Sequence, residues 1–79
     1  MFLCKVIGNV VSQQKLDSLV GKKMLLCERI DGSRHENVVA VDLVGAGIGS
    51  QVLVARSYCD NRNDRIDEWI VGIVDAVSE

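Results

Sequence analysis

The sequence predicts an all-β fold, a small five-stranded barrel of the OB kind, and three observations carry that prediction. The chain of 79 residues contains several short runs rich in β-branched side chains, glycine or Asp-Gly turn signals separate these runs, and proline is absent. A closed barrel suits such short strands because closure removes the exposed edges of the sheet. We expect residues 1–79 to form one domain.

The expected strands follow one another along the chain. The first covers residues 2–13 and bends at Gly8, where a bulge is tolerated, and the second covers residues 23–30, after a polar segment that ends in a glycine. The polar loop "DGSRHEN" leads to a third strand at residues 38–42, and a glycine-rich loop joins it to the fourth strand at residues 51–56.

The end of the chain is ambiguous between a helix and a strand. Residues 57–64 are a loop by composition, and the apolar residues of the stretch 66–77 fit the spacing of an amphipathic helix. The same stretch is rich in β-branched residues and contains Gly72 at its centre. We therefore predict a short helical turn near Asp67 and then the fifth strand.

Composition limits the classes of function. Hydrophobic residues make up 48% of a chain whose core must be thin, so part of the apolar surface is expected to face another subunit. The formal charge of −2 and the pI near 5.3 disfavour a nucleic-acid partner. No apolar run reaches the roughly 20 residues that span a bilayer, and Lys5 interrupts the apolar opening, so we expect a soluble cytoplasmic protein without a membrane partner.

The residues that most often carry chemistry are scattered. Cys4, Cys27 and Cys59 form no CxxC pair; the first two are expected to be buried in strands, and Cys59, in a polar loop, is the thiol expected to be exposed. His35 is expected to be a solvated loop residue, because a single histidine lacks the spacing of a zinc site or of a catalytic dyad. We predict no metal, no cofactor and no catalytic residue.

The stretch "DLVGAGIGSQVLVAR", residues 42–56, is the most distinctive feature. A glycine-rich loop before a helix can bind a phosphate, but this loop leads into a short β-branched run that predicts a strand. Its glycines can form a tight turn that needs positive φ.

The segments "GNVVSQQKLDSLVGKKMLL", "VDLVGAGIGSQVLV" and "IDEWIVGIVD" occur in the order and at the spacing of the EutN/CcmL family of bacterial microcompartment vertex proteins, which this chain resembles over nearly its whole length. The D-x-V-G-A-G-x-G block at residues 42–49 is its most specific element. The stretch "SYCDN", residues 57–61, departs from the family pattern.

The resemblance implies a structural protein, a cyclic homopentamer that fills the vertices of a shell built with hexameric shell proteins. It implies that Gly45, Ala46, Gly47, Ile48 and Gly49 form the loop at the five-fold axis. Small residues there would allow a close approach of symmetry-related backbones, an explanation compatible with the tight turn. Eight further residues match positions of the family and are expected at the subunit interface or in the fold: Lys15, Leu19, Gly21, Lys23, Asp42, Asp67, Trp69 and Asp75.

Physical roles can be suggested for some of these residues. Each of the three aspartates is expected to accept backbone hydrogen bonds at a strand end or turn, or to pair with a cation across an interface. Trp69 is expected in the core or an interface.

Two alternatives come from other classes of function. An OB barrel can bind nucleic acid or another oligomeric ligand, and a cysteine-dependent enzyme is a minor third possibility. The acidic balance and the scarcity of aromatic residues, 4% of the chain, argue against base stacking. The cations are better explained as solvated or paired with neighbouring subunits: Lys22, Lys23, Arg29, Arg34, Arg56, Arg62 and Arg65.

Overall fold

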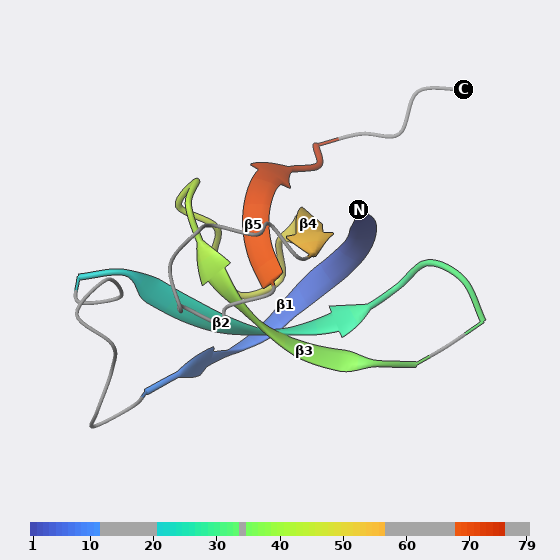
Figure 1. Ribbon diagram of the computed structural model, residues 1–79, viewed down its shortest axis with the longest axis horizontal. Coiled ribbons are helices and arrows are strands. Elements are labelled where there is room, and N and C mark those ends of the chain that lie inside the picture. The colour runs from blue at the N-terminus through green and yellow to red at the C-terminus, as the bar shows by residue number, and fades with distance from the viewer. Residues whose placement is uncertain (12–20, 34, 57–67, 76–79) are drawn as a thin grey trace.

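Five strands close into a barrel in the computed structural model, which describes residues 1–11, 21–33, 35–56 and 68–75 (Figure 1). The strands are β1 (Phe2–Val10), β2 (Lys23–Arg29), β3 (Asn37–Asp42), β4 (Gln51–Arg56) and β5 (Glu68–Ile73). Their order around the barrel is β1-β2-β3-β5-β4, and β4 pairs back to β1. The predicted all-β barrel is confirmed, while the predicted loop at 57–64 and the helical turn near Asp67 lie outside the described residues.

Three strand boundaries differ from the prediction. β1 ends at Val10, where its pairing with Met24 of β2 ends, and Val11 beyond it is 91% exposed. β2 ends one residue before Ile30, and β3 begins one residue early because Asn37 still pairs with β2. Pairing with a neighbour, which β propensity does not report, decides where each strand stops.

The bend predicted at Gly8 is confirmed as a register shift. The pairing of β1 with β2 shifts between Val6 and Gly8, so an extra residue stands in β1 at this point. Gly8 then faces Leu26, and a Cβ built on Gly8 would lie 3.8 Å from the Leu26 Cβ. The bulge lets a single long strand pair with β4 through its first half and with β2 along most of its length (Figure 1).

The core forms from the side chains that alternate to the inside of each strand. Cys4 pairs with Val52 and Phe2 with Val54, so these four side chains form adjacent layers on the inner face. None of the described polar or charged residues is buried. The buried apolar side chains are Phe2, Cys4, Val6, Leu25, Cys27, Val38, Ala40, Val41, Ala46, Val52, Val54 and Ile70.

A short parallel ladder completes the closure of the barrel. Antiparallel pairing joins the other neighbouring strands, whereas β3 and β5 run parallel and pair only through Val41 with Trp69 and Asp42 with Ile70. The chain continues from this ladder directly into the glycine-rich loop, whose first N–H, that of Leu43, donates to the Ile70 carbonyl at 3.2 Å. The loop therefore begins beside the shortest strand pairing of the barrel, that of β3 with β5.

The two cysteines in strands are buried as predicted, and each is fully excluded from solvent. Burial raises the pKa of the Cys4 thiol to about 12, and the nearby Cys27 contributes to the shift. Burial also raises the pKa of Cys27, with a smaller contribution from Asp42. Both thiols therefore stay protonated at neutral pH and are poor nucleophiles.

We predict that these two thiols react only when the barrel opens. In a Cys59→Ser variant, which removes the third thiol, Ellman's reagent should give almost no signal with native protein and two thiols per chain in denaturant. The Cys59→Ser change itself should leave assembly unaltered. Rapid labelling of two thiols under native conditions would show that the barrel opens far more readily than its packing indicates.

Candidate functional site

The candidate site is the loop of residues 43–50, which joins β3 to β4 and covers one end of the barrel (Figure 1). Asp42, at the end of β3, organises the first half of this loop. Its Oδ1 accepts hydrogen bonds from the N–H groups of Val44 at 3.0 Å and Gly45 at 3.1 Å, which confirms the predicted role of an aspartate at a turn.

The second half of the loop is held by Ser50. The Gly47 N–H donates to the Ser50 Oγ at 3.2 Å, and the Ser50 N–H donates to the Gly47 carbonyl at 3.0 Å. The end of the loop is then joined to β1, because the Gly49 N–H donates to the Val6 carbonyl at 2.8 Å and the Val6 N–H donates to the Ser50 carbonyl at 2.9 Å.

A lysine from β2 provides the last contact. The Lys23 Nζ donates to the Ala46 carbonyl at 3.1 Å. Together with the contacts to β1, β5 and the two strands that flank it, this bond connects the loop to all five strands. Such a loop is a rigid surface and not a loose connection.

Glycine occupies its positions in the loop for different physical reasons. Gly45 has φ 84° and Gly49 has φ 91°, values that favour glycine, so the prediction of a turn needing positive φ is confirmed at these two positions. Gly47 has no positive φ, and a Cβ built on it would meet nothing within 4 Å. Neither the turn nor packing against the residues that the structure describes requires glycine at Gly47.

The side chains of the loop face in two directions. Ala46 is 1% exposed and belongs to the core cluster, whereas Ile48 is 65% and Leu43 is 52% exposed. Ala46 was predicted, with the rest of residues 45–49, in the loop at the five-fold axis; within that loop its side chain turns into the core of its own subunit. A methyl group is small enough to fill the end of the core, while the larger apolar side chains point out.

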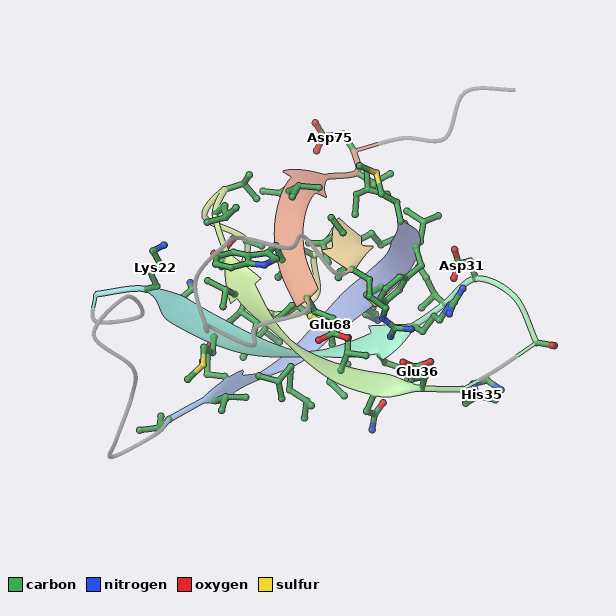
Figure 2. All side chains as sticks on the ribbon, in the orientation of Figure 1. Lys22, Asp31, His35, Glu36, Glu68 and Asp75 are labelled. Atoms are coloured by element: carbon green, nitrogen blue, oxygen red, sulfur yellow. The ribbon has the colours of Figure 1, made fainter. Side chains whose placement is uncertain are left out.

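The opposite end of the barrel carries a network of charges. Figure 2 shows Asp31 and Glu36 at the end of the molecule opposite Lys22. Arg29 pairs with Asp31 at 2.8 Å and with Glu36 at 3.9 Å. Arg56 also pairs with Glu36, so this glutamate joins the two arginines.

Phe2 lies beneath this network. The guanidinium groups of Arg29 and Arg56 stand 4.8 and 4.7 Å from the centroid of its ring, distances at which cations are attracted to aromatic faces. Arg56 also reaches Glu68 of β5, with 3.1 Å between Nε and Oε1. We predicted that these arginines would be solvated or paired with neighbouring subunits; the structure instead gives them partners within the chain.

Asp31 adds a backbone contact to the network. Its Oδ2 accepts a hydrogen bond from the Leu3 N–H at 3.0 Å, which fixes the start of β1. The hydrogen bond from Arg29, and then that from Leu3, hold the pKa of the Asp31 carboxyl below its usual value. A depressed pKa means that the carboxylate stabilises the folded state above the unfolded pKa, about 3.9, and that this contribution is lost as the pH falls toward the folded pKa.

We predict a pH-dependent effect of Asp31→Asn. The variant should unfold at lower urea concentration than the wild type at pH 7, and the difference should shrink as the pH falls below about 4, where the carboxyl of the unfolded chain takes up its proton. Glu28→Gln, which changes an exposed carboxylate of β2, serves as the matched control and should have little effect. A difference that stays constant down to pH 3 would contradict the assigned role of the carboxylate.

The other predicted site residues are spread over the surface. Trp69 is half-buried, and the ammonium of Lys22 lies 5.3 Å from the centroid of its ring. Asp75 is exposed, and Gly21 precedes β2 with φ 81°. Figure 2 places Lys22 and Asp75 well apart. Lys15, Leu19 and Asp67 lie outside the described residues, as does Cys59.

The described part of the chain contains no cluster of three or more His, Cys, Asp or Glu side chains that could hold a metal ion. His35 is exposed, as predicted, at the network end of the barrel (Figure 2). Among the same residues, no helix is long and apolar enough to cross a membrane.

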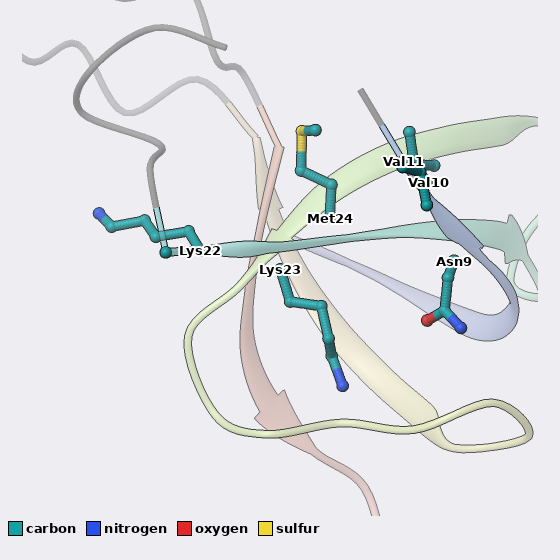
Figure 3. Close-up of a pocket in the computed structure, with 7 residues that line it drawn as sticks. Asn9, Val10, Val11, Lys22, Lys23 and Met24 are labelled. Carbon is teal, nitrogen blue, oxygen red and sulfur yellow. The ribbon is translucent and has the colours of Figure 1, made fainter. Parts of the chain in front are cut away.

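A hollow of about 560 Å³ lies where β1 ends and β2 begins, lined by residues 9–11 and 21–24 (Figure 3). The chain that joins these two strands at this point lies outside the described residues. The hollow therefore carries no argument for a ligand.

The site thus combines a barrel of the OB kind with a rigid glycine-rich loop that exposes apolar side chains, a combination suited to assembly. The family model described as "Ethanolamine utilisation protein EutN/carboxysome" matches residues 1–75, so the chain belongs to the EutN/CcmL family.

The chain is similar to shell proteins of bacterial microcompartments and carboxysomes. The chain is 46% identical to the bacterial microcompartment shell vertex protein PduN of Salmonella typhimurium, with 99% of each protein covered. It is 42% identical to the carboxysome shell vertex protein CcmL of a Synechocystis strain, covering 99% of this chain and 86% of that protein. Among solved structures it resembles the GrpN pentameric microcompartment shell protein of Rhodospirillum rubrum, with a TM-score of 0.81, 45% identity and coverage of 100% and 98%.

Proposed function

We propose that this chain forms a homopentamer that occupies the vertices of a bacterial microcompartment shell in the cytoplasm. A flat layer of hexagonal units cannot close into a polyhedron, and pentagonal units supply the missing angle. The chain is a structural component, with hexameric shell proteins as its neighbours. We infer no catalytic role, because the described cysteines are buried thiols of raised pKa and are poor nucleophiles.

The observation that carries the proposal is the glycine-rich loop of residues 43–50, in a chain that belongs to the EutN/CcmL family. Hydrogen bonds from β1, β2, β3 and β5 hold this loop, yet Leu43, Val44 and Ile48 are 52%, 41% and 65% exposed on it. Rigid apolar side chains on a surface are typical of an interface between subunits. The named relatives, two vertex proteins and one pentameric shell protein, support the ring as the assembly.

Gly47 supports placing this loop near the five-fold axis. Nothing in the described part of its own chain requires a glycine there, whereas symmetry copies that meet at an axis leave little room for a side chain. The loop of residues 45–49 is therefore proposed as the segment closest to the axis.

The mass in solution tests the proposed assembly. Light scattering should give about 43 kDa, five times the 8.6 kDa chain, at micromolar protein concentration. A monomer or dimer under those conditions would refute the proposal.

Nucleic-acid binding tests the alternative function. We expect no measurable binding of single-stranded DNA at physiological salt, because the net charge is −2 and both Arg29 and Arg56 are engaged with carboxylates. A sub-micromolar affinity that falls steeply with salt would favour the OB-fold binding module instead.

A further inference from the structure

The link between β2 and the glycine-rich loop has a defined geometry. Lys23 is the first residue of β2, in phase with Leu25 and Cys27, whose side chains fill the core. Its aliphatic stem therefore leaves the strand on the inner face of the barrel. Figure 3 shows Lys23 extending away from Met24, which lies on the other side of the strand. The ammonium thus reaches the mouth of the barrel, where the loop covers it.

Ala46 receives this contact at the middle of the loop. Its methyl group is buried in the core cluster, and its carbonyl accepts the hydrogen bond from the Lys23 Nζ. Lys23 is also paired with Asp42 in the register of β2 and β3, and Asp42 fixes the first turn of the loop. The start of the loop and its midpoint are therefore both fixed by one cross-strand residue pair, Asp42 and Lys23.

The other described hydrogen bonds of the loop come from the loop itself, from its flanking strands, or from the backbones of β1 and β5. The bond from Lys23 alone brings a charged side chain from a strand more than 20 residues away in sequence. Hydrogen bonds to a charged group are stronger than neutral ones, and they fix the orientation of the carbonyl that accepts them.

We propose that Lys23 is a positioning residue for assembly: its ammonium fixes the Ala46 carbonyl and thereby the conformation in which the exposed part of the loop packs against other copies of this chain. This inference rests on the proposed role of the loop in the ring. A loop that is ordered before association costs less to bind than one that must be ordered during association.

Lys23→Met tests the proposal, since it keeps an apolar stem and removes the ammonium. The protomer concentration for half-assembly should rise by about tenfold or more, as expected for loss of a hydrogen bond to a charged group. The far-UV spectrum of the subunit should stay that of the barrel, and amide hydrogen exchange of residues 43–50 should become faster in dilute protein. Lys5→Met, which removes an exposed lysine of β1, is the matched control and should assemble like the wild type.

Chemical rescue separates a positioning role from a general loss of stability. Lys23→Cys, in a chain that also carries Cys59→Ser, can be alkylated in the native state with 2-bromoethylamine, because Cys4 and Cys27 are buried. The product carries an ammonium at nearly the length of lysine and should restore assembly and slow exchange in the loop, while unalkylated protein should not.

Two results would overturn the inference: Lys23→Met protein that assembles like the wild type, or an assembly defect that aminoethylation leaves unchanged. A wild-type chain that forms no ring would instead refute the proposed function, so the two failures are distinguishable.

Discussion

Ala46→Asp is expected to unfold the subunit or to leave it folded only marginally. The Ala46 methyl is 1% exposed among the apolar side chains of the core, so the substitution places a carboxylate where no described polar group is buried. The effective penalty for burying a charge is several kcal/mol, a large fraction of the roughly 5–15 kcal/mol by which domains are stable. Lys23, which donates to the Ala46 carbonyl, can offset only part of this penalty.

Urea unfolding followed by far-UV circular dichroism measures this effect. Ala46→Gly is the matched control, because it removes the same methyl without adding charge and should cost only about 1 kcal/mol from the lost burial. An Ala46→Asp protein with an unchanged urea midpoint would show that the Ala46 side chain faces solvent. Since the subunit itself is lost, this substitution does not test the five-fold contact.

The strands were predictable because burial imposes a period of two on them. Residues such as Cys4 and Val6 alternate with outward-facing neighbours, and Gly8 interrupts that alternation at the observed bulge. The position of Asp42 at the end of a predicted strand, just before the glycine-rich loop, also predicted its role as an acceptor of loop N–H groups. Local sequence patterns therefore predicted the strands, the bulge and the turn at Asp42, each of which depends on a few successive residues.

The direction of Ala46 was not predictable in the same way. A loop has no regular alternation, so its sequence does not say which side chain turns inward. The register of β2 against β3 and the closure of the barrel at β5 decide it, and both are non-local.

The partners of the arginines depend on closure as well. Arg56 meets Glu36 and Glu68 because the ends of β4, β3 and β5 converge around Phe2, not because these residues are close in sequence. The bond from Lys23 to Ala46 belongs to the same class, since it joins residues 23 positions apart. A possible signal for it was the position of Lys23, in phase with the inward residues Leu25 and Cys27.

Ile48→Asp is the substitution that should abolish the ring while the barrel survives. Ile48 is 65% exposed on the glycine-rich loop, so a charge there has little effect on an isolated subunit, within about half a kcal/mol for an ordinary surface position. In a pentamer with this loop at the axis, the change brings five carboxylates together and removes five apolar contacts. Each pair of like charges a few ångströms apart costs on the order of 1 kcal/mol or more at intermediate dielectric.

The mass in light scattering should therefore fall from about 43 kDa toward the 8.6 kDa of the single chain, with an unchanged far-UV spectrum. Ile30→Asp is the matched control: Ile30 is also exposed, at 42%, but lies beyond the other end of β2, beside the charge network, and its substitution should leave the ring intact. A pentamer of unchanged stability carrying Ile48→Asp would refute the axial position of the loop. If the ring is lost as expected, shells co-expressed with the variant should be open or elongated, because the vertices that close a layer of hexagonal units would remain unfilled.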